Sequence, residues 1–262
     1  MPLAYLPDLR LQYRLDGAPD GPVLVLTHAL GTNLTIWDHV IPLLPPSLRI
    51  LRYDHRGHGG SDVPPAPYSM GALITETERL LDHLAIRDCV FLGLSMGGLV
   101  AQGLAIKRLD LVRALVLSNT ATKIGTESLW QDRIAAVRAG GLDAVNASTT
   151  QRIFSRAFRA TPGIVPWQNL LRHGSAEGYL GCAAAIAGTD FYTPTASLRL
   201  PTLAIAGSED GVTPPDLVRE TADLIPGSRF ALIRGGGHLP FVERPNAYSE
   251  ALTTFLKEIG HV

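Results

Sequence analysis

One serine in this chain stands among glycines in a way that favours chemistry over packing. The stretch FLGLSMGGLVAQG, residues 91–103, places Ser95 in a Gly-x-Ser-x-Gly pattern between Gly93 and Gly97. An apolar strand-like run precedes the serine and a helix-like run follows it, so a sharp turn would raise its hydroxyl above a sheet. Glycines on either side tolerate that bend because they carry no Cβ. The pattern predicts a nucleophile; the alternative is a turn that only packs a helix on a strand.

A serine hydroxyl needs a general base, and the base needs a carboxylate to orient it. His238 lies in RGGGHLPFVERP, on a glycine-rich loop after the last strand-like run. The segment AIAGSEDGVTPP, after the penultimate run, offers Glu209 and Asp210. Asp210 is favoured as the residue nearer the turn, with Glu209 as the alternative. The sequence thus predicts a triad of Ser95, Asp210 and His238.

Acyl transfer also requires N–H donors for the oxyanion of the tetrahedral intermediate. The residue after the nucleophile, Met96, is expected to give one backbone N–H. The loop His28-Ala29-Leu30-Gly31, after the strand-like run PVLVLTH, is expected to give the other through Leu30. Taken alone, that loop reads equally well as an ordinary turn.

Short apolar runs of the kind that form buried parallel strands recur along the chain. Between them lie helical patterns, for example at residues 73–84 and 248–259, which predicts a mostly parallel sheet with helices on both faces. The strand-like runs are 10–15, 22–28, 48–54, 89–94, 112–118, 202–207 and 229–235.

The alternation of strands and helices stops between residues 120 and 195. Patterns at 126–139, 142–158, 164–173 and 176–187 are helical, with glycine and proline between them. We therefore expect a helical cap at 120–195, inserted before the penultimate strand into a core formed by 1–119 and 196–262.

The composition and charge of the chain argue against several classes of function. The chain has 262 residues, 46% of them hydrophobic, and a net charge of −1, which argues against a nucleic-acid or anionic-membrane surface. Only Cys89 and Cys182 are present, so a reducing, cytoplasmic location is expected. The N-terminal residues do not resemble a signal peptide. The uncharged run 89–106 has the length of a membrane helix, but its glycines favour strand, turn and helix.

Two other chemistries receive little support. His55 and His58 in DHRGHGGSD suggest zinc, but two histidines on a glycine loop are not a ligand set. No phosphate-binding glycine motif follows a strand, which argues against nucleotides. We therefore expect neither a metal nor a cofactor, and a small-molecule ester or lactone as the partner.

With these residues assigned, the chain resembles the α/β-hydrolases over nearly its whole length, and their triads follow the same Ser, Asp, His order. It is most similar to the 3-oxoadipate enol-lactonases of aromatic-compound degradation, the β-ketoadipate pathway. The stretches that carry this resemblance are GLSMGGLVAQGLA, NTATKIGTESLW (119–130), AEGYLGCAAAIAGTD (176–190), HALG and DHRGHGGSD. The resemblance implies an α/β-hydrolase fold and the hydrolysis of 3-oxoadipate enol-lactone to 3-oxoadipate through an acyl-enzyme.

A substrate with a carboxylate arm needs a matching donor. Arg133, close to Trp130 on the predicted cap, is the candidate for that role, because a guanidinium pairs well with a carboxylate. Trp130 and Trp37 are candidates for the pocket wall. The alternatives are a solvated surface arginine and a tryptophan that only packs in the core.

Other functions remain compatible with the same triad. A small-molecule carboxylesterase or a C–C bond hydrolase would use the same residues. A ligand receptor on a hydrolase scaffold is an alternative of another class, in which slow turnover serves binding. Dehalogenases and epoxide hydrolases fit poorly, because they place a carboxylate where this chain has Ser95.

Overall fold

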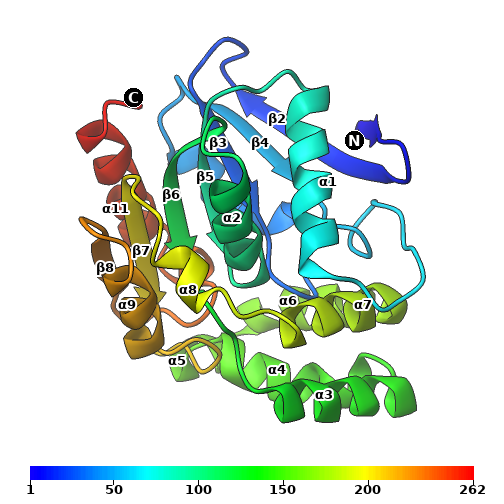
Figure 1. Ribbon diagram of the computed structural model, residues 1–262. Helices are drawn as coiled ribbons and strands as arrows, with labels where there is room; N and C mark the ends of the chain where they lie inside the picture. The colour runs from blue at the N-terminus through cyan, green and yellow to red at the C-terminus, as the bar shows by residue number, and fades with distance from the viewer.

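A single eight-stranded sheet forms the centre of the computed structural model, which describes all residues 1–262 (Figure 1). The order across the sheet is β1-β2-β4-β3-β5-β6-β7-β8. The strands are β1 (Leu3–Tyr5), β2 (Arg10–Gly17), β3 (Val23–Thr27), β4 (Arg49–Tyr53), β5 (Cys89–Leu94), β6 (Val112–Ser118), β7 (Thr202–Gly207) and β8 (Arg229–Ile233).

Only β2 runs against its neighbours, pairing antiparallel with both β1 and β4. The remaining pairs are parallel, from β4 through β3, β5, β6 and β7 to β8. Their carboxyl ends therefore meet at one edge, which is where ligands bind in open α/β sheets. The predicted mostly parallel sheet is confirmed, and β5, β6 and β7 have the predicted bounds. The short β1 was not predicted.

Helices cover both faces of the sheet, as expected (Figure 1). They are η1 (Leu34–His39), η2 (Ile41–Leu43), α1 (Met70–His83), α2 (Met96–Lys107), α3 (Glu127–Gly140), α4 (Asp143–Ile153), α5 (Arg156–Arg159), η3 (Pro162–Ile164), α6 (Val165–Arg172), α7 (Ala176–Ala187), α8 (Tyr192–Thr195), α9 (Pro215–Asp223), α10 (Pro240–Glu243) and α11 (Pro245–Glu258).

The two faces of the sheet explain why its strands read as continuous apolar runs. In β5, Phe91 packs in the cluster that contains α1 and α2, while Leu92 packs in the cluster that contains α11. Successive side chains of a strand point to opposite faces, so a strand covered on both faces is apolar at every position. All residues of β5 and β7 are buried.

Helices α3 to α8 all lie between β6 and β7 in the chain, and α3 to α7 lie across the carboxyl ends of the strands (Figure 1). The expected single helix over 142–158 is wrong, because the chain is extended at Phe154 and a new helix, α5, starts at Arg156, where the Ser155 side chain caps it. Helix α7 is held against the loop after β4 at Gly178 and Gly57, where a Cβ on Gly178 would lie 1.9 Å from the Gly57 carbonyl oxygen.

No helix has both the length and the apolar character needed to cross a membrane. The uncharged run 89–106 is divided between β5 and α2, with Ser95 at the turn between them.

Candidate active site

Ser95 lies on a strained turn between β5 and α2. Its φ of +55° falls in the left-handed region that side-chain-bearing residues rarely adopt. Strain of this kind persists only where the surrounding structure imposes it. Here a Cβ on Gly93 would come within 2.2 Å of the Gly97 carbonyl oxygen, and one on Gly97 within 2.2 Å of Thr27 Oγ1. The glycines therefore allow α2 to start close against β5 and β3.

The structure brings His238 and Asp210 together at the ends of β8 and β7. His238 Nδ1 lies 2.8 Å from Asp210 Oδ2, and both residues are buried. A carboxylate oxygen can only accept, so Nδ1 carries the proton and Nε2 is left as the basic nitrogen. His238 and Ser95 line the same cavity, although the Ser95 hydroxyl makes no hydrogen bond to His238 in this structure. Glu209, the alternative carboxylate, is exposed and accepts from the Arg156 backbone N–H.

Two residues that sequence reasoning missed hold the Asp210 carboxylate. Asn119 Nδ2 and Thr213 Oγ1 each donate to Oδ2 at 2.8 Å. Oδ1 accepts the backbone N–H groups of Val212 and Thr213 at 2.7 and 3.1 Å. Asn119 directly follows β6, at the same edge of the sheet as the predicted triad. This position at the end of a strand is the feature of the sequence that could have marked Asn119 as a site residue.

The electrostatic environment keeps Asp210 ionised. Burial alone would raise its pKa, but the charge of His238 and the hydrogen bonds from His238, Asn119 and Val212 outweigh burial. The pKa of Asp210 therefore lies below its ordinary value. An ionised Asp210 can orient the imidazole and stabilise an imidazolium.

The two predicted oxyanion donors come from different segments, the start of α2 and the loop after β3. Met96 is the first residue of α2, so its N–H has no acceptor within the helix. The N–H of Leu30 has no hydrogen-bond partner, while the carbonyl oxygen of Ala29 accepts from Thr32 Oγ1 at 2.8 Å and from His28 Nδ1 at 2.9 Å. In a trans peptide the C=O and N–H point in opposite directions, so these bonds aim the Leu30 N–H away from Thr32.

A narrow cavity of about 70 Å³ connects these groups with helices α3, α4 and α7. Ser95, His238 and Leu30 line it from the sheet edge, and Trp130 and Arg133 line it from α3. Its further lining includes Arg152 from α4 and Tyr179 from α7, which were not predicted.

Both arginines retain donors for a ligand. Arg133 Nε donates to the Tyr179 hydroxyl at 2.5 Å and its Nη2 to Thr149 Oγ1. Arg152 Nε donates to the Gly211 carbonyl at 2.9 Å. The Nη1 of Arg133 and both Nη atoms of Arg152 make no hydrogen bond to the protein. Isolated arginines have no sequence pattern that distinguishes a pocket residue from a surface residue, and Arg152 was missed for this reason.

Trp37 does not line this cavity, which corrects the prediction for it. Its ring is fully buried and stacks on Phe241 with 4.4 Å between ring centroids. The residue belongs to the 3₁₀ helix η1, which turns it toward the core on the α11 side of the sheet. Trp130 does reach the cavity, and its Nε1 donates to the Ile124 carbonyl at 2.6 Å.

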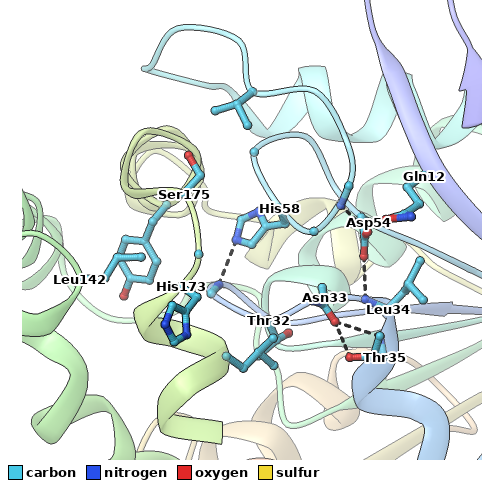
Figure 2. Close-up of a pocket in the computed structure, with 18 of the residues that line it drawn as sticks. Gln12, Thr32, Asn33, Leu34, Thr35, Asp54, His58, Leu142, His173 and Ser175 are labelled. Carbon is cyan, nitrogen blue, oxygen red and sulfur yellow. Dashed lines mark hydrogen bonds between the residues drawn. The ribbon is translucent and has the colours of Figure 1, made fainter. Parts of the chain in front are cut away.

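A second and larger cavity, of about 630 Å³, does not have Ser95 in its lining; Figure 2 shows this cavity. The loops after β3 and β4 line it with Gly31, Thr32 and His58, and the segment of α6 and α7 lines it with His173 and Tyr179. Of the two cavities, only the smaller is lined by Ser95 and His238.

The histidines first considered as zinc ligands form a buried cluster with His28. Ring centroids lie 4.7 Å apart for His28 and His55, and 5.2 Å apart for His28 and His58. The Nε2 atoms of His28 and His58 already accept backbone N–H groups, from His55 at 3.0 Å and Gly31 at 2.9 Å. The Nε2 lone pairs of His28 and His58 therefore already accept hydrogen bonds and are not free to bind a metal ion.

Comparison with known proteins agrees with this architecture. The chain is 36% identical to 3-oxoadipate enol-lactonase 2 of Acinetobacter baylyi, over 97% of this chain and 95% of that protein. The crystal structure of the enol-lactonase from Burkholderia xenovorans matches with a TM-score of 0.94 at 32% identity, covering 98% of this chain and all of that one. A thermophilic esterase from Thermogutta terrifontis matches with a TM-score of 0.91 at 27% identity, covering 99% and 97%.

The family model described as "Alpha/beta hydrolase family" matches residues 24–251, from β3 into α11. The strand order and the turn at Ser95 agree with that match. The chain belongs to the alpha/beta hydrolase family.

Proposed function

We propose that this protein is a serine hydrolase that opens the ring of 3-oxoadipate enol-lactone to give 3-oxoadipate. The observation that carries the proposal is the convergence, on one small cavity, of a strained serine, a buried His–Asp pair and an unpaired backbone N–H. The likeness to two enol-lactonases supports the choice of substrate.

In the first half of the reaction, Ser95 Oγ attacks the lactone carbonyl carbon while His238 Nε2 takes its proton. The carbonyl oxygen becomes an oxyanion, which the N–H groups of Leu30 and Met96 stabilise. Collapse of this intermediate breaks the bond between the acyl carbon and the ring oxygen. His238 returns its proton to that oxygen, and the resulting enol tautomerises to the ketone.

In the second half, water replaces the leaving group. His238 takes a proton from water as the water attacks the Ser95 ester, and the same oxyanion donors stabilise the second intermediate. Its collapse frees the carboxylate product and returns the proton to Ser95. Asp210 stays ionised throughout and stabilises the imidazolium in each half.

The charge of the cavity supports an anionic substrate. Arg133 and Arg152 both line it, and no acidic side chain does. We propose that Arg133 binds the carboxylate arm with its free Nη1 and that Trp130 forms the apolar wall beside it. The small volume favours a compact lactone over a long-chain ester. We also propose that residues 120–195 act as a cap that provides this binding surface, on a catalytic core formed by 1–119 and 196–262.

The test compares kcat/KM on 3-oxoadipate enol-lactone, generated in situ, with kcat/KM on uncharged 4-nitrophenyl acetate. EDTA is present in both assays, and Ser95→Ala is the blank. The proposal predicts fast lactone opening that disappears in Ser95→Ala, with weak cleavage of the acetate. A preference for the acetate would favour the carboxylesterase and contradict the substrate. Tight retention of the lactone without turnover would favour the ligand receptor.

A further inference from the structure

We propose that His58 is a positioning residue for the oxyanion hole, which holds the Leu30 loop in its catalytic conformation by accepting the Gly31 N–H. This inference rests on the proposed serine-hydrolase function, in which Leu30 gives one oxyanion donor. The bond joins His58 Nε2 to the Gly31 N–H at 2.9 Å (Figure 2).

On that side the loop that carries Leu30 has two kinds of support: the bond to His58, and side chains near Gly31, where an added Cβ would lie 2.7 Å from Leu171 Cδ1. Residues 28–33 belong to no helix or strand, and Gly31 has a φ of +75°. The cavity of about 630 Å³ borders the loop at Gly31 and Thr32. Part of the loop surface therefore faces this cavity and makes no contact with other side chains there. Figure 2 shows the His58 ring in the cavity wall with its bond to the loop.

Two sets of hydrogen bonds fix the two peptide groups around Leu30. The preceding peptide is fixed through the Ala29 carbonyl oxygen, which accepts from Thr32 Oγ1 and His28 Nδ1. The following peptide is fixed through the Gly31 N–H, which donates to His58. Planar peptides leave only φ and ψ of Leu30 free between these anchors, so the two anchors together set the direction of its N–H.

The protonation state of His58 suits this role. A backbone N–H can only donate, so Nε2 must be unprotonated, and Nδ1 carries the proton toward the Arg56 carbonyl at 3.2 Å. Burial lowers the pKa of His58 to about 4, so the ring is neutral at neutral pH. The His28 ring and Cys182 Sγ also face the ring, and neither is charged at neutral pH.

Three variants separate positioning from packing. His58→Leu removes the acceptor, and His58→Gln offers an amide oxygen near the former position of Nε2. His55→Leu is the matched control, since His55 lies in the same buried cluster but its ring makes no hydrogen bond to the loop. We expect His58→Leu to lower kcat about 10- to 100-fold with little change in KM. His58→Gln should recover most of that loss, and His55→Leu should keep most of the activity.

A second readout reports on the oxyanion hole directly. A short-chain trifluoromethyl ketone adds to the serine and presents an oxyanion, so its inhibition constant should rise in His58→Leu by the same factor as kcat/KM falls. Loss of core packing alone would not link these two quantities. In the wild-type protein, a scalar coupling between the Gly31 nitrogen and His58 Nε2, measured by NMR, should be detectable without any variant.

The outcomes distinguish this inference from the function on which it rests. If the wild type shows no Ser95-dependent hydrolysis, the proposed function fails. If the wild type hydrolyses its substrate but His58→Leu and His55→Leu lose the same activity at the same thermal stability, the positioning role alone is overturned. Absence of the Gly31–His58 coupling in the active wild type would overturn it as well.

Discussion

The sheet edge and helices α3 and α4 contribute to the cavity around Ser95 in different ways. At the sheet edge, Asp210 receives hydrogen bonds from His238, Asn119 and Thr213, and its position is fixed on every side. From the helices, Arg133 and Arg152 reach the same cavity with part of each guanidinium unpaired. The Asp210 carboxylate is saturated by the protein's own groups, while the two guanidinium groups keep unpaired donors.

This difference suggests a division of roles. A group that must hold one geometry through several proton transfers is best placed at the end of a buried strand, where the backbone is rigid. A group that selects the substrate can be placed on a helix whose sequence changes without disturbing the sheet. Variants of the sheet edge should therefore affect every substrate, and variants of the helices should affect only substrates that carry a carboxylate.

The largest expected effect is that of Ser95→Ala. Removal of the nucleophile should lower kcat by about 10⁴- to 10⁶-fold for lactone and neutral ester alike. Alanine keeps the Cβ, so the backbone strain at this position is unchanged and the fold should persist. Circular dichroism checks the fold and initial rates check kcat. Retention of more than a hundredth of the activity on either substrate would contradict a role for Ser95 as nucleophile.

Acid should lower the unfolding free energy of the protein through the buried histidines His55 and His58. Burial, with the charge of His58 as a smaller cause, lowers the pKa of His55 to about 3, and burial lowers that of His58 to about 4, against an ordinary value of 6.5. The unfolded chain therefore binds more protons below pH 6.5, so stability is full above that pH and falls as the pH drops toward 4. By pH 5 each of the two histidines should cost about 2 kcal/mol of unfolding free energy.

Asp54 changes the pH dependence of stability in the opposite direction to the two histidines. Burial raises its pKa to about 6, so its protonation in the folded state offsets about 1 kcal/mol of that loss by pH 5. Burial also lowers the pKa of His28, which adds to the loss, so denaturant titrations at pH 7 and pH 5 should show a net loss of at least about 3 kcal/mol. The loss should be smaller in His58→Gln, which lacks one of the titrating groups. Equal or greater stability at pH 5 would contradict neutral buried histidines.

Arg133→Leu should affect hydrolysis of the lactone much more than hydrolysis of a neutral ester, unlike variants of the sheet edge. Loss of a charge-assisted bond to the carboxylate arm is expected to lower kcat/KM on the lactone about 10- to 100-fold. Hydrolysis of 4-nitrophenyl acetate, which has no carboxylate, should change little. Arg138→Leu is the control, because Arg138 is exposed on the same helix. Equal losses on both substrates would show that Arg133 supports the fold of the cavity and not recognition of the carboxylate.

The smallest effect is expected from Thr213→Val. Valine keeps the shape of threonine but removes the hydroxyl that donates to Asp210 Oδ2 at 2.8 Å. One neutral donor to a buried carboxylate is worth about 1 to 2 kcal/mol, so kcat should fall about 5- to 30-fold. The fall should be the same for lactone and acetate, and steady-state kinetics on both checks it. A loss confined to the lactone would contradict the assignment of Thr213 to the sheet region.

The sequence predicts those features of the fold that depend on burial and on backbone geometry. Strands β5, β6 and β7 are covered on both faces, so their apolar runs start and stop where the strands do. The glycines around Ser95 reflect a bend that few other residues tolerate. By contrast, β1 has three residues, of which only Ala4 is buried, and it has no pattern to detect.

The parts set by tertiary contact were not accessible. Asn119 and Arg152 serve the site through partners far away in sequence, at Asp210 and Gly211. Trp37 lies close to the Leu30 loop in sequence, which suggested the pocket, but the 3₁₀ helix η1 turns its ring into the core against Phe241. Which way a helix turns a side chain depends on packing that no local pattern encodes.

Covalent trapping tests the role of Ser95 as the nucleophile most directly. Diethyl 4-nitrophenyl phosphate transfers its phosphoryl group to an activated serine and releases nitrophenolate, so the adduct can be located by peptide mass spectrometry. We expect one adduct per chain, on the peptide that contains Ser95, in parallel with loss of lactonase activity, and no adduct in Ser95→Ala. An adduct on another residue, or full lactone turnover by a protein already modified at Ser95, would contradict this role.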